Sequence, residues 1–401
     1  MRDASRIFGA HAAHLRRCDL RSSLTHPRMR ALRCSAAPLG PPRRSRGRDP
    51  WTPNLSAGPP TTPPLPVNVA IVGPAGSGKT TLFNALTGGR GADGVGMVDV
   101  PDERLDRLAA AVKPLKTTAA QVRVEDTPPG SRAQRVAFAR QADVLVKVAR
   151  CFGPDPDPAA ELEEFALDLV LADLASVERR LEIVAKEARA GKKDAQAEHD
   201  VLTVAKEHLD GGKVLRTLTL EPDQRALLMG VFPVTMKPAV YVANAADELL
   251  PGGGEPAARV VKLAKAEGAP AIVLSTRLEA ELGELDPSEQ AEMRAGYGID
   301  ESGLGRIARA VWETGGLITY FTAGEPEVRA WPCERDAPAP IAASKIHTDF
   351  EKHFIRAEVT SVDELVDAGS MDALRAAGKL RVEGREYRVK DGDVVFFRVG
   401  R

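Results

Sequence analysis

From Val67 onward, the chain alternates short apolar runs with longer amphipathic stretches. Five runs rich in small and branched apolar residues are VNVAIV, AAQVRVED, ADVLVKVAR, PAVYVAN and APAIVLST, the second of which ends at Asp126. Apolar runs of this length, separated by helical patterns, are typical of strands in a parallel sheet that is covered on both faces. We therefore expect an α/β domain with helices on both sides of a parallel sheet.

The long gap between the third and fourth runs indicates an insertion, from about Pro158 to Phe232. Apolar residues recur there at steps of three and four, which places them on one face of a helix. The predicted face consists of Leu167, Leu171, Leu174, Val177, Leu181, Val184 and Ala188, and a second helix passes through Val201, Leu202, Ala205 and Leu209. We expect an antiparallel pair of helices, which we interpret first as a packing element.

After about Gly315 the pattern changes to alternation of apolar and polar positions. The alternating segments are LITYFT, EVRAW, FIRAEV, KLRVEG, REYRV and DVVFFRV, with turns such as EGRE and KDGD between some of them. This pattern predicts a small mixed sheet in a separate C-terminal domain.

Composition excludes several classes of protein. The 401 residues carry a net charge of −1, so there is room for two or three domains but no global positive field for nucleic acid. No apolar stretch approaches the roughly 18 residues of a membrane span, and we expect no membrane partner. The cysteines (Cys18, Cys34, Cys151 and Cys333) lack the spacing of a zinc site or a disulfide framework. We expect a cytoplasmic protein.

Residues 1–66 have a different composition from the rest of the chain. They contain twelve arginines, no lysine and no glutamate, and they end in a proline-dense stretch. Such a segment buries too little apolar surface to offset its ordering entropy, so we expect it to be disordered. An organelle transit peptide and a start site assigned too far upstream are both compatible with it.

The clearest chemical motif is GPAGSGKT, which begins at Gly73 directly after the first predicted strand. It has the form GxxxxGK followed by Thr, and a helical pattern follows it. In this order, glycines let backbone N–H groups face phosphates, the helix N-terminus adds a positive end, and Lys79 supplies a charge. The candidate nucleotide-binding residues here are Gly73, Pro74, Ala75, Gly76, Ser77, Gly78, Lys79, Thr80 and Thr81, with Lys79 as the candidate catalytic residue.

Further candidates lie at the ends of later strands. Thr80 offers a hydroxyl to Mg²⁺, and Asp126 is the natural second carboxylate of that site. Asn244 follows a strand where ligands bind in open α/β sheets, and Asp247 can accept from the N1–H and N2 amino group of guanine. The segment Ser275–Arg277, at the end of the last run, is placed to present backbone amides to the base, with Ser275 and Thr276 as the candidate binding residues.

These motifs in this order resemble the Obg-related P-loop NTPases, and the region from Val67 to Arg401 resembles the YchF subfamily of Obg-like ATPases. The resemblance is densest in GLITYFTAGEPEVRAW, IHTDFEKHFIRAEV and AGKLRVEGREYRVKDGDVVFF, and it extends to VPDERLDRLAAAVKP, VARCF and LVLADLASVERRLE. It implies a nucleotide-binding G-domain, an inserted α-helical arm and a C-terminal β-grasp (TGS) domain. It also implies a preference for ATP over GTP, and association with the ribosome or ribosomal RNA through the arm and the TGS-like domain.

The domain organisation that follows has five segments. They are an Arg/Pro-rich extension (1–66), the nucleotide-binding domain in two parts (67–157 and 233–314), the α-helical arm (158–232) and the TGS-like domain (315–401).

The chain departs from this family at both switch regions. The segment 88–98, GGRGADGVGMV, contains no Thr or Ser to close over Mg²⁺, and Asp93 is its only side-chain oxygen. In DTPPGS, Pro129 stands where a glycine N–H normally meets the γ-phosphate, and proline has no N–H; Gly130 could restore that amide by a shift of one place. The nearest glutamine, Gln134, lies several residues into a predicted helix.

The position of the base-reading carboxylate also differs. The family has Asn followed three places on by Glu, whereas this chain has Asp247 there and Glu248 one residue later. The resemblance favours ATP, and the shorter carboxylate of Asp247 keeps GTP open.

The C-terminal segment carries the basic residues Arg381, Arg385, Arg388, Lys390 and Arg398, interleaved with acidic ones. This pattern is typical of a solvated sheet face. His347 has no accompanying nucleophile and carboxylate, so we expect a structural role for it.

Three functions remain open from the sequence. The first is a slow, Mg²⁺-dependent ATPase or GTPase that acts near the ribosome. The second is a nucleotide-gated binding module without appreciable hydrolysis, because the switch regions are degenerate. The third, a small-molecule kinase, rests only on GSGKT and ranks last, since no lid or acceptor site is evident.

Overall fold

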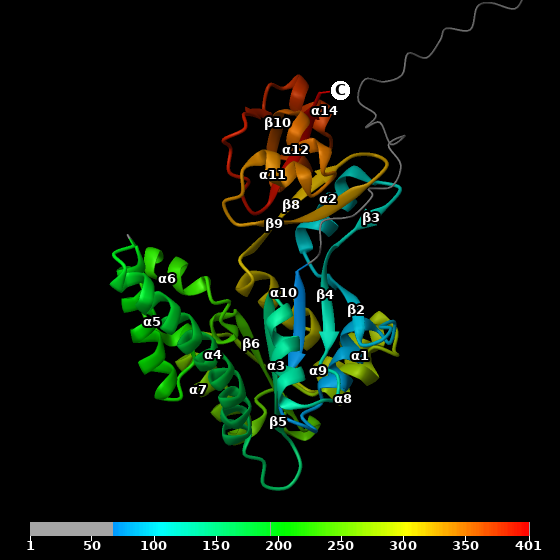
Figure 1. Ribbon diagram of the computed structural model, residues 1–401. Coiled ribbons are helices and arrows are strands. Elements are labelled where there is room, and N and C mark those ends of the chain that lie inside the picture. Colours follow the sequence, from blue (N-terminus) through cyan, green and yellow to red (C-terminus); the bar gives the residue numbers. More distant parts are fainter. Residues whose placement is uncertain (1–66, 193, 401) are drawn as a thin grey trace, which may run out of the picture. The chain divides into compact units, whose positions relative to one another are not determined.

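The computed structural model describes residues 67–192 and 194–400 (Figure 1). The expectations for residues 1–66 lie outside this part of the chain. Within the described ranges, no helix combines the length and the apolar character that a membrane crossing requires.

The first sheet has six strands in the order β2-β4-β1-β5-β6-β7. The five predicted apolar runs form β1 (Asn68–Val72), β4 (Ala120–Asp126), β5 (Val144–Cys151), β6 (Ala239–Ala245) and β7 (Ala271–Leu274). These five strands pair in parallel with one another, which confirms the predicted parallel sheet.

The edge strand β2 (Val95–Val100) was not predicted and runs antiparallel to β4. Its first residues are glycine-rich and belong to the segment that we interpreted as a switch loop. Only Val98 and Val100 of this strand are buried, so its apolar pattern is weak, and the backbone ladder to β4 supplies its order.

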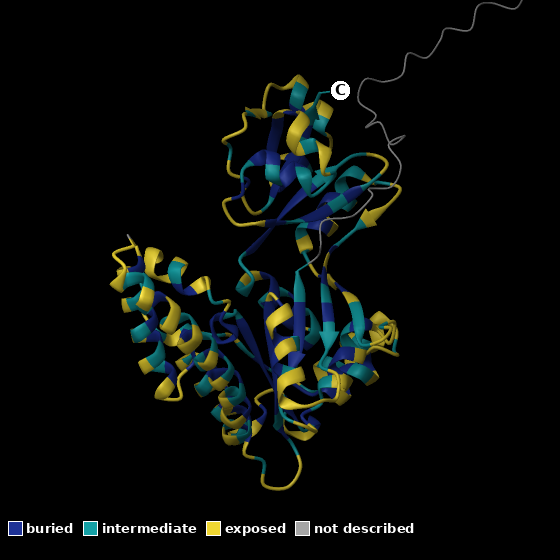
Figure 2. Ribbon diagram, viewed as in Figure 1, coloured by how far each residue is buried: buried dark blue, intermediate teal, exposed yellow. Residues whose placement is uncertain are grey.

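Helices cover both faces of this sheet. Val69 and Ile71 of β1 pack on the side of α1 (Lys79–Thr87) and α10 (Gly303–Thr314), while Ala70 and Val72 pack on the side of α3 (Arg132–Gln141). Alternate residues of one strand thus face two helical layers, which is why the run is apolar throughout. The central strands β1, β5 and β6 are the most deeply buried part of this region (Figure 2).

The remaining helices of this region lie around the sheet and in its connections. They are α2 (Glu103–Val112), α7 (Gly254–Ala266), α8 (Thr276–Leu282) and α9 (Pro287–Gly296), and the short 3₁₀ turn η3 (Asp247–Leu249) follows β6.

The insertion forms two long antiparallel helices, α4 (Pro158–Arg189) and α5 (Ala195–Asp210), which pack along each other (Figure 1). The shorter elements η1 (Leu215–Thr217), α6 (Pro222–Met229) and η2 (Val234–Met236) follow. The predicted buried face of α5 is confirmed, because Val201, Leu202, Ala205 and Leu209 are all buried.

The predicted face of α4 was wrong at its N-terminal end. Leu167 and Leu171 are 46% and 40% exposed, whereas Phe165, Leu169 and Val170 are buried. The reason is that the first turns of α4 pack against the sheet domain and only the later ones pack against α5. The buried stripe therefore changes direction along the helix.

The second sheet has the order β11-β10-β12-β8-β9-β3. Its strands are β8 (Leu317–Ala323), β9 (Val328–Glu334), β10 (Phe354–Ser361), β11 (Arg381–Glu383), β12 (Asp393–Val399) and the two-residue β3 (Thr117–Thr118). The helices α11 (Ala339–Ser344), α12 (Asp349–His353), α13 (Val362–Ala368) and α14 (Met371–Ala376) complete this region.

The predicted strand REYRV is absent from this sheet. Arg388 makes an isolated bridge to Pro338 instead, and Tyr387 donates its hydroxyl to Asp393 at 2.7 Å. The alternation of polar and apolar residues in REYRV is typical of a strand, but in the structure Tyr387 follows a turn. His347 packs its ring 5.6 Å from that of Phe350 and accepts from the Asp349 N–H, contacts typical of a structural residue.

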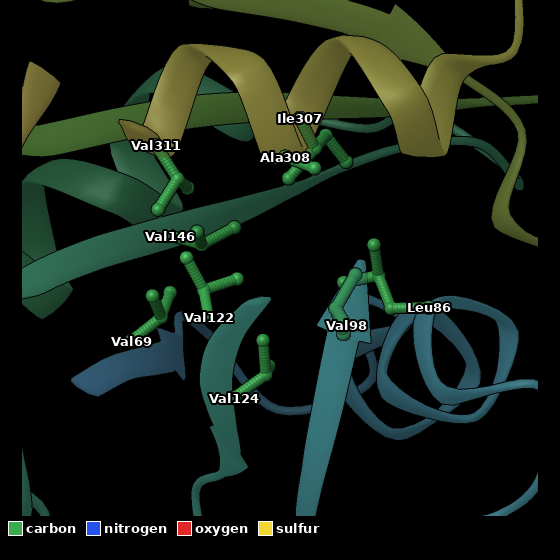
Figure 3. Close-up of a pocket in the computed structure, with 9 residues that line it drawn as sticks. All are labelled: Val69, Leu86, Val98, Val122, Val124, Val146, Ile307, Ala308 and Val311. Carbon is green, nitrogen blue, oxygen red and sulfur yellow. The ribbon is translucent and has the colours of Figure 1, made fainter. Parts of the chain in front are cut away.

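The core beneath α10 contains one small gap (Figure 3). It has a volume of about 10 Å³ and is lined only by apolar side chains, among them Val69, Val122, Val146 and Ile307, which point toward one another. An apolar space of this size stays dry, so we assign it no ligand.

Candidate nucleotide site

The loop between β1 and α1 has the conformation that its glycines predict. Gly73, Gly76 and Gly78 have φ values of 144°, 73° and 96°. A Cβ atom at Gly73 would lie 2.4 Å from the Val148 carbonyl oxygen, and one at Gly78 would lie 2.3 Å from Asn244 Nδ2. Both positions therefore require glycine for the space as well as for the backbone.

The N-terminus of α1 has no side-chain cap, because Gly78 is its N-cap residue. The first backbone N–H groups of the helix therefore keep their hydrogen-bonding capacity for an external acceptor. Such an end is suited to an anion, which also gains from the helix dipole.

Lys79 begins this helix and folds back over the loop. Its Nζ donates to the carbonyl oxygens of Gly73 at 3.1 Å and Pro74 at 2.6 Å. Burial lowers the pKa of Lys79, the Asp126 carboxylate opposes that shift, and the Arg135 guanidinium adds to it. The positive charge of Arg135 therefore affects Lys79 in the phosphate-binding loop.

Thr80 and Asp126 lie together as predicted. Thr80 Oγ1 donates to Asp126 Oδ2 at 2.7 Å, and Asp126 Oδ1 is buried without a hydrogen-bond partner. An unsatisfied carboxylate oxygen beside a hydroxyl fits Mg²⁺, which prefers oxygen ligands. In the part of the chain that is described, no group of three or more His, Cys, Asp or Glu side chains is placed to hold a metal. A magnesium ion here would take its other ligands from water and phosphate.

These residues open into a cavity of about 860 Å³, a size typical of a cofactor site. Of the predicted residues, Gly73, Pro74, Ala75, Lys79, Thr80 and Asp126 line it, as do Asp93 and Pro129 of the switch segments. Gly76, Ser77, Gly78 and Thr81 of the loop do not line it, nor do the four residues predicted for the base.

Another wall of this cavity was not predicted from the sequence. It includes Arg135 of α3 and the α4 residues Glu161, Glu164, Phe165 and Asp168. Nothing in the local pattern marks these residues, because they reach the cavity only through the packing of α4 beside α3.

Asn244 connects three loops. Its Nδ2 donates to the Ser77 carbonyl oxygen and its Oδ1 accepts from the Thr276 N–H, each at 2.9 Å. Both ends of the amide are thus engaged within the protein, which holds the end of β6 against the phosphate loop. The predicted contact of Asn244 with a purine stays a prediction.

Asp247 is buried and its two carboxylate oxygens are in use. Oδ1 accepts from the Ser275 hydroxyl, and Oδ2 accepts from Nε of Arg277 at 3.0 Å and from its Nη2. Burial alone would raise the pKa of Asp247, but the bonds from Ser275 and Arg277 outweigh it and hold that pKa below its usual range. The sequence placed Arg277 only as one of three backbone donors, and its side-chain bond to Asp247 was not predicted.

In the second switch segment, the side chain of Gln134 is engaged within the protein. Gln134 Oε1 accepts from the Ser131 N–H at 2.8 Å, and the Ser131 hydroxyl accepts in return from the Gln134 N–H. This capping box begins α3 and keeps the glutamine side chain at the helix end.

Comparison with known proteins agrees with this architecture. A ribosome-binding ATPase YchF of Bacillus subtilis is 37% identical in an alignment of length 363 that covers 83% of this chain and 99% of that protein. The chain belongs to the YchF family. The YchF protein of Escherichia coli O157:H7 is 37% identical over 354 residues, covering 82% of this chain and 97% of the relative.

Two further matches support the same assignment. Residues 317–400 match the family YchF-GTPase_C, described as "Protein of unknown function (DUF933)". The solved structure of the Schizosaccharomyces pombe YchF GTPase superposes with a TM-score of 0.76 at 26% identity, covering 85% of this chain and all of that one. The resemblance drawn from the motifs, and the fold class with it, are confirmed.

Proposed function

We propose that this YchF protein binds ATP with Mg²⁺, hydrolyses it slowly and associates with the ribosome. The observation that carries the proposal is the glycine loop, with Lys79, Thr80 and Asp126, at the wall of one large cavity. The curated relatives are named ribosome-binding ATPases, which supports both the ligand and the partner.

The proposed chemistry is mainly positioning. Backbone N–H groups of the loop and of the start of α1 bind the phosphates, and Lys79 leaves its two carbonyl acceptors to meet phosphate oxygens. Thr80 and Asp126 hold Mg²⁺ through their oxygens. When bound, Mg²⁺ neutralises charge on the phosphates and orients them.

Hydrolysis is expected to be slow, because two groups that assist it are missing. Pro129 offers no N–H to the γ-phosphate, and Gln134 is engaged in the cap of α3. The loss of one such preorganised donor costs about a hundred- to a thousandfold in rate.

The base site supports ATP over GTP. Guanine needs one lone pair on each carboxylate oxygen, for its N1–H and its N2 amino group. A carboxylate oxygen has about two acceptor sites. Oδ1 of Asp247 accepts once, from Ser275, but Oδ2 already accepts twice, from Nε and Nη2 of Arg277. Adenine makes no such demand, since its N1 is an acceptor and it has no amino group at position 2. A guanine would therefore have to displace Arg277.

We further propose that the helical arm (158–232) and the TGS-like domain (315–401) make the ribosome contact. Both carry many exposed charges, but in the C-terminal domain several of them are neutralised locally. Arg398 donates to the Glu358 carboxylate at 3.2 Å and Arg381 to the Asp393 carboxylate at 3.5 Å. We therefore expect a mixed contact with protein and RNA rather than a purely electrostatic one.

The test is phosphate release under multiple turnover with excess Mg²⁺ and ATP. We expect a slow rate that Lys79→Ala abolishes, while Lys265→Ala, at an exposed lysine of α7, leaves it unchanged. A background rate that is equal in all three proteins would reject the ATPase. Cosedimentation of the full chain with ribosomes tests the second part of the proposal.

A second function is favoured by the same two switch features. Pro129 offers no N–H to the γ-phosphate and Gln134 is engaged in the cap of α3, so the alternative is an ATP-gated binding module that does not hydrolyse its nucleotide. Recovery of intact ATP from the purified complex after many hours would favour this module, and conversion to ADP would exclude it.

A further inference from the structure

Arg135 lines the same cavity as the phosphate loop. It is the fourth residue of α3, and it lines the same space as Lys79 and Thr80. Its positive charge also contributes to the lowered pKa of Lys79, after burial as the main cause. The loop thus has a second positive group nearby that no phosphate-binding motif supplies.

The present partners of Arg135 are exchangeable. Its Nη1 donates to the Gly130 carbonyl oxygen at 3.1 Å, and its Nη2 donates to Asp168 Oδ2 on α4 at 3.2 Å. These bonds are longer than the 2.7–2.9 Å typical of charge-assisted pairs, and the side chain is 38% exposed. Asp168 would not be left alone without it, because Arg132 Nε lies 2.9 Å from Asp168 Oδ1.

The terminal phosphate of a bound triphosphate needs a second cationic side chain in this protein. The γ-phosphate brings charge that Lys79 and one Mg²⁺ do not fully offset, and Pro129 removes the amide that would normally help. A guanidinium matches phosphate oxygens in a bidentate way and stays charged at any physiological pH. Arg135 is attached directly behind the Pro129–Gly130 turn, so it is placed where that amide is lost.

We propose that Arg135 is the sensor of the terminal phosphate: a bound triphosphate draws its guanidinium away from Asp168, and a diphosphate does not. This inference rests on the proposed nucleotide binding. It adds a link from the nucleotide to the helical arm, because the exchange removes one of the two arginine contacts between α3 and Asp168 of α4.

The alternative is that Arg135 only ties α3 to α4. Arg132 provides the matched control, because it lies on the same helix and binds the same carboxylate but does not line the cavity. A purely structural role predicts the same effect for loss of either arginine.

The experiment measures the dissociation constants of Mg²⁺-bound AMP-PNP and ADP by calorimetry for the full chain and its variants. We expect Arg135→Ala to weaken AMP-PNP about ten- to a hundredfold while ADP changes little, because one charge-assisted contact is lost from the triphosphate alone. Arg132→Ala should leave the ratio of the two constants unchanged. Asp168→Asn should tighten AMP-PNP relative to ADP, since it releases Arg135 from a competing carboxylate.

The outcomes separate the two proposals. Equal weakening of both nucleotides by Arg135→Ala, or an equal effect of Arg132→Ala, would overturn the sensor and leave nucleotide binding intact. No binding of either nucleotide to the wild-type protein would overturn the proposed function, and the sensor with it. If Arg135→Ala does not fold, Arg135→Lys and Asp168→Asn decide: a ratio unmoved by both rejects the sensor.

Discussion

At the scale of single residues, glycines of this chain meet two different requirements, one of the backbone and one of the available space. Gly78 needs both its positive φ and the space that its missing Cβ leaves beside Asn244. Gly212, after α5, has a positive φ of 71° but open space around it. The two positions therefore separate the backbone requirement from the steric one.

We predict that Gly78→Ala destabilises the protein more than Gly212→Ala. The control should cost about 1–2 kcal/mol for its left-handed backbone alone. Gly78→Ala adds the displacement of Asn244, which should also disturb the phosphate loop and weaken ATP binding. Urea unfolding of both variants, with ATP titrations, measures the difference, and equal losses would show that Asn244 moves aside freely.

The base site yields a second prediction at this scale. Arg277→Ala frees Oδ2 of Asp247 and should improve GTP affinity relative to ATP by about tenfold, the value of one charge-assisted hydrogen bond. Glu281→Gln is the control, because it changes the other partner of Arg277 and leaves the pair with Asp247 in place. Competition binding with both nucleotides gives the ratio. An unchanged ratio of GTP to ATP affinity in Arg277→Ala would show that Arg277 does not compete with guanine for the Asp247 carboxylate.

Local sequence could predict the loop but not these arginines. The residues from Gly73 to Thr80 are contiguous, so their spacing alone specifies the turn and the start of α1. Arg277 meets Asp247 across 30 positions, and Arg135 meets Asp168 across 33. These ion pairs depend on how loops and helices pack against one another. A local sequence pattern does not predict that packing.

At the scale of elements, a buried ionic cluster joins the helical arm to the first sheet. Glu267, at the end of α7, accepts from Arg216 of η1, from Tyr241 of β6 and, at 3.3 Å, from Lys147 of β5. Burial lowers the pKa of Lys147 to about 8. Burial alone would raise the pKa of Glu267, but Lys147 and Arg216 hold it below its usual value.

We predict that Glu267→Gln costs about 3–5 kcal/mol of unfolding free energy at neutral pH, because it leaves two buried cations without a counter-charge. Since the folded-state pKa of Glu267 is lowered, its contribution is present above the unfolded value of 4.5 and is lost as pH falls through the folded one. The wild type should therefore lose more stability than the variant upon acidification.

Denaturant unfolding between pH 7 and pH 3 measures this difference. Glu255→Gln, an exposed glutamate on the same helix, should behave like the wild type at every pH. If the unfolding free energies of the wild type and of Glu267→Gln changed in parallel with pH, the pKa of Glu267 would not differ between the folded and the unfolded state.

Secondary structure was predictable where one environment holds along an element. The strands β1, β5 and β6 are buried on both faces, and α5 keeps one buried face, so both patterns are plain in the sequence. α4 changes its packing partner along its length, which misplaced Leu167 and Leu171. β2 has glycines where a strand usually has side chains, and its order comes from the ladder to β4.

At the scale of the whole molecule, the two sheets are less independent than the alternating pattern suggested. β3, from the N-terminal part of the nucleotide domain, pairs with β9, and Arg104 of α2 bonds to Asp391 at 2.7 Å. Val69 of β1 and Val394 of β12 belong to one continuous apolar cluster. The proposed boundary near residue 315 thus separates two sheets that share buried surface.

The account depends most on a phosphate cradle that still works beside shortened switch segments. Calorimetric titration of Mg²⁺ and ATP into the folded protein tests this directly, with Lys79→Ala alongside and circular dichroism to verify folding. The account predicts saturable, one-to-one binding that the variant loses. A folded wild-type protein that takes up no ATP at millimolar concentration would contradict it.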